Sequence, residues 1–221
     1  MAHSIILLPL IGFLISCSLS FFKSNKFIDR AAEIITSLFI TITAIFSFYI
    51  FIDNIGDPSF VSIKLFNWIS SGSFNADWSI YLDTATRVML VVITSVSALV
   101  HIYSIGYMSH DDSKPRFMGY LSLFTFAMLM LVTADNFLQL FFGWEGVGLA
   151  SYLLIGFWYK KPTANAAAIK AFIVNRIGDF GLALGIFTIF IVFGSIEYQT
   201  VFSNVSSFKL SLIHISEPTR P

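Results

Sequence analysis

The sequence predicts an all-α membrane protein with about six transmembrane helices. Of its 221 residues, 56% are hydrophobic and 12% are charged, against about 25% charged residues in soluble globular domains. The apolar residues gather in windows of about 20, the length at which a helix crosses a hydrocarbon core of about 30 Å. Because 13 basic residues balance 13 acidic ones, charge gives no argument for a nucleic-acid partner.

The apolar windows form one predicted transmembrane helical domain, residues 1–209. They lie near residues 4–22, 34–52, 84–108, 117–134, 136–159 and 171–196. The first window lacks the basic residues that precede the apolar core of a secretory signal, so we expect a retained span. Residues 210–221 (LSLIHISEPTRP) resemble the in-frame translation of a transposon-based sequencing adapter, and we exclude them from any chemistry.

Basic residues near the window ends predict the orientation, because such residues are retained on the cytoplasmic or matrix side. The first, third and fifth windows are followed by Lys23, Lys26, Arg30, Lys114, Arg116, Lys160 and Lys161. The alternate loops hold only Lys64. We therefore expect the N-terminus to lie outside. Trp158 and Tyr159 precede the last lysine pair, where an interfacial aromatic belt is expected.

The first outside loop has a pattern typical of strands. Residues 61–83 read VSIKLFNWISSGSFNADWSIYLD, in which two partly alternating apolar segments flank Ser-Ser-Gly-Ser. This pattern predicts a surface β-hairpin.

Charged residues at membrane depth are the first candidates for function. Counted from Asn136, Glu145 lies about 14 Å into the fifth window, close to the midplane. Counted from Ala171, Asp179 lies about 12 Å into the sixth, and Arg176 lies one turn nearer the inner face. Two carboxyl groups are therefore expected at similar depth on helices that run in opposite directions.

Each of these charges needs a partner, because an ionised side chain at the bilayer centre costs between about 2.5 and more than 10 kcal/mol. Arg176 and Asp179 are three residues apart and can pair on one helix face. Glu145 has no such neighbour in its own helix. Small residues surround it, at Gly143, Gly146, Gly148 and Ser151, and they allow another helix to approach closely. We expect its partner to come from another span.

A buried carboxyl group with a movable cation beside it is a switchable proton site. Desolvation favours its neutral form, whereas a cation within a few ångström favours its ionised form. Moving the cation away from Glu145 would load a proton, and its return would expel the proton. The alternative is a glutamate that bonds across helices only to fix packing.

Other titratable residues admit simpler interpretations. Lys170 lies at the inner start of the sixth window, where lysines extend to water. His101 could relay protons or could hold a neighbouring carbonyl. Asp83 and Arg87 are four apart and indicate a pair at the end of the third span. Glu33 is interpreted as a boundary charge. The chain has no glycine-rich phosphate loop, CxxC motif or haem-type histidine pair, which predicts that it binds no nucleotide, iron-sulfur cluster or haem.

Five segments resemble the antiporter-like subunit L of respiratory complex I, the bacterial NADH-quinone oxidoreductase, whose mitochondrial counterpart is subunit 5 of NADH dehydrogenase. They are HIYSIGYM (101–108), YLSLFTFAMLMLV (120–132), ADN (134–136), GWEGVGLASYLLIGFWY (143–159) and KAFIVNRIGDFG (170–181). The resemblance covers residues 1–196 and is most specific around Glu145.

The resemblance implies a fold and a set of site residues. The family has two inverted repeats of five helices after three N-terminal helices, so the chain is expected to be an N-terminal fragment. Glu145 matches the family's fifth-span glutamate, which pairs with a lysine on a discontinuous seventh helix outside this sequence. Arg176 and Asp179 match its charged pair in the sixth span, and Lys170 matches a lysine at the start of that span.

The function implied is proton translocation coupled to electron transfer from NADH to quinone. NADH, FMN, iron-sulfur clusters and quinone are then expected in partner subunits, with no cofactor or metal on this chain. The expected location is the inner membrane of a bacterium or a mitochondrion, beside other membrane subunits of the complex. The alternatives are the large subunit of a multisubunit sodium-proton antiporter, which is similar over the same spans, and a noncatalytic membrane scaffold.

Overall fold

The computed structural model describes residues 1–22, 25–56, 59–72 and 74–205. Lys23 and the adapter-like residues 210–221 therefore lie outside the described part. The helices are α1 (Ala2–Ser20), α2 (Lys26–Asp53), α3 (Thr84–Tyr107), α4 (Lys114–Val132), α5 (Phe137–Ile155), α6 (Pro162–Phe193) and the short α7 (Tyr198–Asn204). The strands are β1 (Val61–Ser71) and β2 (Phe74–Leu82). Within the described part six helices are long and apolar enough to cross a membrane, which confirms the predicted fold class.

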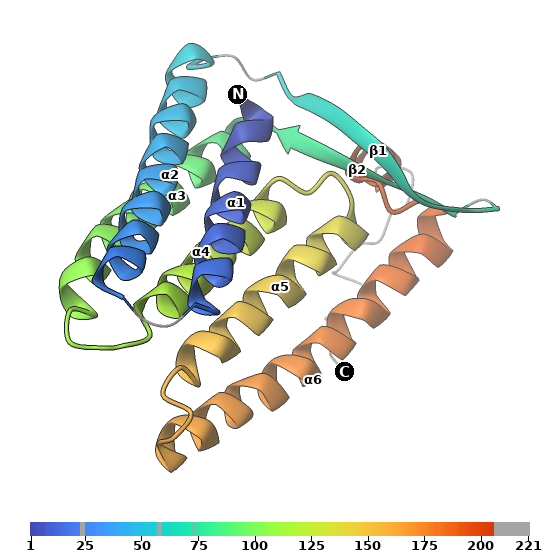
Figure 1. Cartoon of the computed structure of the whole chain (residues 1–221). Coiled ribbons are helices and arrows are strands. Elements are labelled where there is room, and N and C mark those ends of the chain that lie inside the picture. Colours follow the sequence, from blue (N-terminus) through green and yellow to red (C-terminus); the bar gives the residue numbers. More distant parts are fainter. Residues whose placement is uncertain (23–24, 57–58, 73, 206–221) are drawn as a thin grey trace, which may run out of the picture.

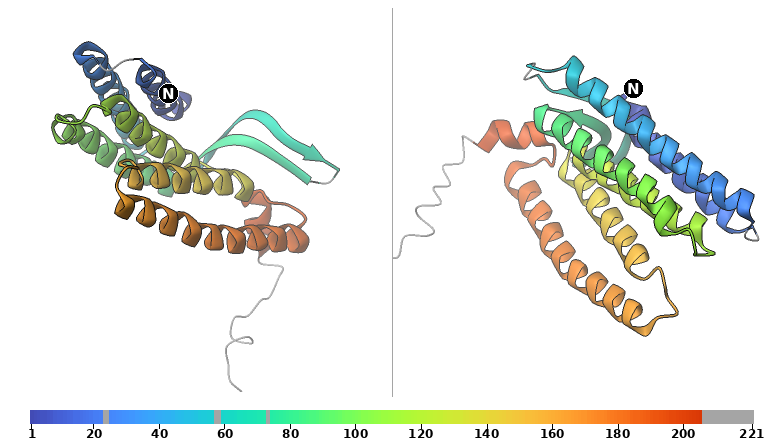
Figure 2. Two further views of the ribbon diagram at one scale, coloured as in Figure 1. Left: turned by 60° about the horizontal axis from the view of Figure 1, so that its bottom comes forward. Right: turned by 90° about the vertical axis from the view of Figure 1, so that its left-hand side faces the viewer.

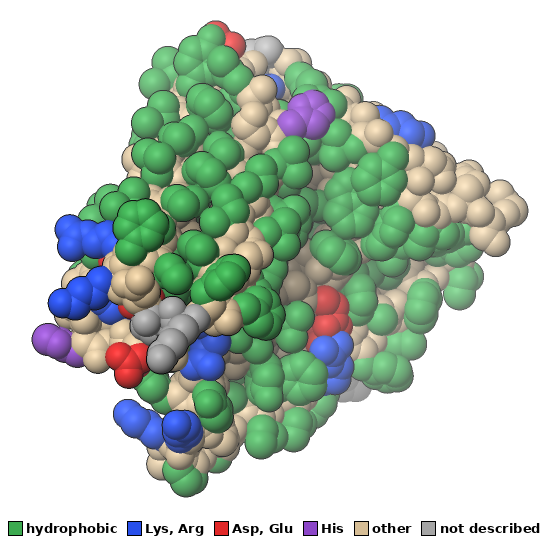
Figure 3. Space-filling model, in the orientation of Figure 1, with side chains coloured by type: hydrophobic (Ala, Val, Ile, Leu, Met, Phe, Trp, Pro, Cys, Tyr) green, Lys and Arg blue, Asp and Glu red, His purple; other side chains and the backbone are tan. Residues whose placement is uncertain are grey.

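The long helices run alternately up and down (Figure 1). α1 to α4 form a bundle, α5 packs against α4, and α6 packs against α5 at the edge of the molecule, as all views show (Figures 1 and 2). The last turn of α1, the first turn of α2 and the α3–α4 and α5–α6 turns lie toward one end, where basic side chains gather (Figure 3), and we call it the basic end. The N-terminus and the β-hairpin mark the opposite, hairpin end. Which end faces the cytoplasm or matrix stays a prediction.

The predicted β-hairpin is confirmed. β1 and β2 pair antiparallel from Val61–Leu82 to Ser71–Phe74. β2 is fastened to the start of α5 by the Gln139 side chain, whose amide donates to the Ser79 carbonyl at 2.7 Å and accepts from the Ser79 N–H at 3.2 Å. This side chain takes the place of a neighbouring strand, so the hairpin has a fixed position over α5.

Buried hydroxyl groups fill much of the bundle between the apolar contacts. They include those of Ser16, Thr36, Thr43, Ser47, Thr94, Ser104, Ser122 and Thr125. Most donate to the carbonyl four residues earlier, as Thr36 does to Ala32 at 2.8 Å, so their hydrogen bonds are made within their own helices. Because these side chains are small, they also let neighbouring helices approach closely. His101 is fully buried among them. Its Nδ1 lies 2.8 Å from the Ser97 carbonyl, the carbonyl-holding role that the sequence left open.

Several boundaries differ from the predicted windows. α6 begins at Pro162, nine residues before the predicted Ala171, because proline suits the first helical position and the alanines that follow are strong helix formers. α2 likewise begins at Lys26, so Glu33 lies inside the helix. The interpretation of Glu33 as a boundary charge is wrong, since it is buried and faces Lys114 Nζ at 3.6 Å. Asp83 caps α3 by accepting from the Thr86 N–H at 2.7 Å.

Candidate functional site

The structure brings together three of the four predicted site residues. Glu145 lies near the middle of α5, about 12 Å from Phe137 and about 15 Å from Ile155 along the helix axis. Arg176 and Asp179 lie in the central part of α6. We call Glu145, Arg176 and Asp179 the Glu145 triad.

Arg176 is the partner that Glu145 requires from another span. Its Nη1 lies 2.7 Å from Oε1 and 2.6 Å from Oε2 of Glu145. The same nitrogen lies 3.6 Å from Oδ2 of Asp179. The sequence predicts Asp179 as the partner of Arg176, but the short contacts go to Glu145. One cation is therefore shared unequally by two carboxylates.

Two aromatic side chains hold the triad in place, and sequence reasoning missed both. The Trp144 indole N–H donates to Oδ1 of Asp179 at 2.8 Å, which ties α5 to α6 a second time. The Arg176 guanidinium lies over the Phe172 ring, 4.8 Å from its centroid. The spacing carried a signal for Phe172, because residues four apart share a helix face. Trp144 stood beside Glu145 in the sequence, but nothing there placed its indole near Asp179.

The glycines of α5 mainly allow this helix to pack closely against α4. A Cβ built on Gly143 would lie 2.5 Å from the Leu131 backbone nitrogen, and one on Gly146 would lie 3.0 Å from Ala127 Cβ. The side chain of Asn175, on α6, lies 3.6 Å from the Cβ position of Gly148. The close approach that the small residues predicted thus joins α5 to the bundle, while the partner of Glu145 comes from the other side.

The triad is only partly covered. Exposed side-chain fractions are 23% for Glu145, 51% for Arg176 and 7% for Asp179. Figure 3 shows acidic and basic side chains meeting in an otherwise apolar surface between α5 and α6. A half-exposed guanidinium beside two acceptors has room to change its partner.

Lys170 lies apart from the triad. It stands six residues before Arg176, which is about 9 Å along the axis of α6 and about two-thirds of a turn around it. Its side chain is exposed, and among the described residues it forms no ion pair with the triad. In the part of the chain that the structure describes, no group of three histidine, cysteine, aspartate or glutamate side chains could hold a metal ion.

Comparison with known proteins identifies the family. Residues 68–118 match the N-terminal family model of chain 5 of NADH-ubiquinone oxidoreductase (complex I), and residues 134–216 match the transmembrane model of NADH:quinone oxidoreductase and Mrp antiporters. Subunit L of NADH-quinone oxidoreductase from Rickettsia felis is 57% identical over 81% of the chain, and that from Rhodobacter capsulatus is 48% identical over 97%. The chain belongs to the subunit L family. Chain 5 of Chondrus crispus NADH-ubiquinone oxidoreductase is 52% identical over 92% of the chain.

These three relatives are much longer than this chain, which spans 28% to 30% of their length. The fold also matches a chain in the structure of the Mrp complex from Dietzia sp., with a TM-score of 0.72 and 22% identity, over 93% of this chain and 21% of that one. This likeness concerns the fold alone. The arrangement of α1 to α6 is thus similar to that in the matched chain of the Mrp complex.

Proposed function

We propose that the chain is a proton-translocating membrane subunit of NADH-quinone oxidoreductase, and that Glu145 is its proton-holding group. The observation that carries this proposal is the unequal sharing of Arg176 between two carboxylates near the middle of α5 and α6. A fixed packing contact would require only one acceptor for the guanidinium. Two acceptors provide two positions for the same cation.

The proposed step is a movement of the Arg176 guanidinium toward Asp179. In the described arrangement the cation lies against Glu145 and favours its ionised form. When the guanidinium moves to Asp179, Glu145 is left in a poorly solvated position with no close cation, and it takes up a proton. Return of Arg176 expels the proton. Trp144 keeps the Asp179 carboxylate oriented as the second acceptor.

The coupling partners lie outside this chain in the proposal. NADH, FMN, iron-sulfur clusters and quinone are assigned to other subunits of the enzyme, so this chain takes part in the reaction through proton movement only. Its neighbours would be further membrane subunits of the complex and the surrounding lipid. The names of the relatives and their sequence identity to this chain support the inner membrane of a bacterium or a mitochondrion as the location. Lys170 is proposed to supply protons from the basic end.

A glutamine in place of Glu145 tests this function. We suggest a chimera in which residues 1–205 replace the matching part of Rhodobacter capsulatus subunit L, assembled in its complex. Glu145→Gln keeps the shape and removes the titrating group, so we expect NADH-driven proton pumping to fall at least about tenfold with assembly intact. Glu197→Gln is the matched control, because Glu197 is exposed at the hairpin end. Unchanged pumping in Glu145→Gln would favour a scaffold.

The antiporter alternative makes a different prediction for membrane vesicles that contain the same chimera. A sodium-proton antiporter subunit would give proton movement that follows an imposed sodium gradient and needs no NADH. Sodium-driven exchange that Glu145→Gln abolishes, together with antiporter genes beside the gene for this chain, would replace the first proposal by the second.

A further inference from the structure

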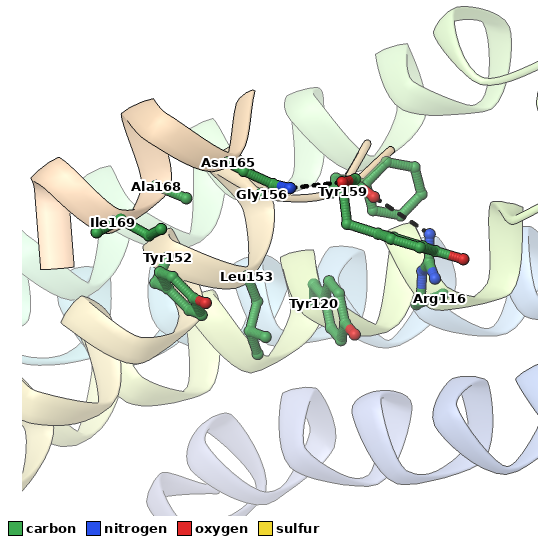
Figure 4. A pocket seen from close by; sticks show the side chains of 10 residues that line it. Arg116, Tyr120, Tyr152, Leu153, Gly156, Tyr159, Asn165, Ala168 and Ile169 are labelled. Carbon is green, nitrogen blue, oxygen red and sulfur yellow. Dashed lines mark hydrogen bonds between the residues drawn. The ribbon is translucent and has the colours of Figure 1, made fainter. Parts of the chain in front are cut away.

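A cavity of about 400 Å³ lies at the basic end, between α4, α6 and the turn that joins α5 to α6 (Figure 4). Arg116 of α4 stands at one side of it, and Tyr152 and Leu153 of α5 and Ile169 of α6 line the other. Its size falls in the range of about 300–1,000 Å³ that is usual for small-molecule sites. The proposed proton path does not use it.

The polar side of the cavity is a preorganised arginine. The Arg116 guanidinium carbon lies 4.7 Å from the centroid of the Phe157 ring and 5.4 Å from that of Tyr159. One Nη donates to the Phe157 carbonyl at 3.2 Å. Among the described residues Nε has no hydrogen-bond partner although it is buried. The guanidinium is thus fixed while part of its five-donor capacity stays free for an anionic acceptor.

The charge around the cavity favours an anion. Arg116 is its charged lining residue, and no acidic side chain lines it. A neighbouring cavity of about 330 Å³ adds Lys160 and Lys161, together with Asp111 and Asp112. Asp111 already accepts from the Trp158 indole at 3.0 Å and from the Ser113 N–H at 2.8 Å.

The opposite side of the cavity is apolar and lies deeper along the helices. Leu153, Ala168 and Ile169 line it, and Ile169 is about half exposed. Trp158 and Tyr159 mark the interfacial level, as such residues do at membrane boundaries. A ligand that fits would therefore carry its negative group at the boundary and an apolar part toward the hydrocarbon.

We propose that this cavity binds the phosphodiester headgroup of an anionic phospholipid from the leaflet at the basic end. The phosphate oxygens accept hydrogen bonds from the free donors of Arg116. The lysines of the neighbouring cavity, Lys160 and Lys161, strengthen the attraction for the negative charge. One acyl chain lies along Leu153 and Ile169. Basic pockets between transmembrane helices are suited to such headgroups. Inorganic phosphate shares the charge chemistry but cannot use the apolar side.

Native mass spectrometry of the full chain in detergent, with added phosphatidylglycerol or phosphatidylcholine, tests the site. We expect the chain to retain phosphatidylglycerol preferentially, and Arg116→Gln to weaken that retention about fivefold. Arg30→Gln is the matched control, because Arg30 is an exposed arginine at the same end that does not line the cavity. Circular dichroism checks that each variant is folded.

A second variant keeps the test valid if Arg116→Gln does not fold. Ile169→Asp alters only the exposed apolar side, and it should weaken phosphatidylglycerol retention without touching the arginine. Equal retention of the two lipids, or full retention in either variant, would overturn the proposal. Displacement of phosphatidylglycerol by millimolar inorganic phosphate would show that the site takes free phosphate instead.

Discussion

The α1–α4 bundle and the α5–α6 pair each contain an ion pair between helices, in very different surroundings. In the bundle, Glu33 and Lys114 have side chains that are 6% and 19% exposed. Between α5 and α6, Glu145 and Arg176 are 23% and 51% exposed. In the most apolar 18-residue stretch of α4, 44% of the residues are buried, whereas the corresponding shares are 17% in α5 and 11% in α6. The shielded pair fixes helices, whereas the open pair has a second acceptor and space to move.

The seam between α4 and α5 holds these two regions together, and its disruption should have the largest effect. In Gly143→Ala the added methyl would lie 2.5 Å from the Leu131 backbone nitrogen, so the helices would have to separate. We expect a loss of about 3 kcal/mol or more in stability, measured by thermal unfolding of the chain in detergent.

Gly148→Ala is the control for this seam, since the nearest atom to its added methyl lies at 3.6 Å, an ordinary contact. A Gly143→Ala protein as stable as the Gly148→Ala protein would show that α5 is not locked to the bundle.

Removing only one partner of the Glu33–Lys114 pair should cost more stability than replacing both partners. Lys114→Met leaves the buried Glu33 carboxylate without its cation and should destabilise the chain by about 3 kcal/mol. The double variant Glu33→Leu with Lys114→Met should recover most of this loss, because apolar replacements of a buried pair are often neutral. Chemical unfolding of the single and double variants measures the difference.

Lys64→Met is the matched control for Lys114→Met, because the Lys64–Asp77 pair is exposed on the hairpin and should contribute at most about 1 kcal/mol. If both lysine variants lose the same stability, the contrast between shielded and open pairs is wrong.

The smallest expected effect on stability concerns Trp144. Trp144→Phe removes the indole N–H that orients Asp179, at a cost of about 1 kcal/mol. Without this bond Asp179 is a poorer second acceptor for Arg176, so Glu145 should take up its proton less readily and NADH-driven pumping in the chimera should fall a few-fold. The infrared band of protonated carboxyl groups, recorded beside pumping, tests this cause.

Trp158→Phe loses a comparable bond, from its indole to Asp111 at the basic end, and should leave pumping unchanged. Equal loss of pumping in both variants would mean that Trp144 does not act through the Glu145 triad.

The sequence predicted the helices and the hairpin because apolar windows and strand alternation are local patterns. It also predicted that Glu145 finds its partner in another span, because depth follows from position along a helix. It did not predict that the partner is Arg176, since the three-residue spacing favoured a local pair with Asp179 and no pattern encodes a distance between helices. Glu33 was misplaced for a similar reason: its burial depends on how α4 packs against α2.

The length of α6 has a consequence for Lys170. Its 32 residues extend about 48 Å, well beyond a hydrocarbon core of about 30 Å. The surplus must emerge from the lipid or incline the helix. Where the surplus emerges at the Pro162 end, the alanine-rich turns leave the lipid, and Lys170, about 12 Å along the helix axis from Pro162, comes to the water boundary. A membrane of different thickness would submerge or release this ammonium group without any change in sequence.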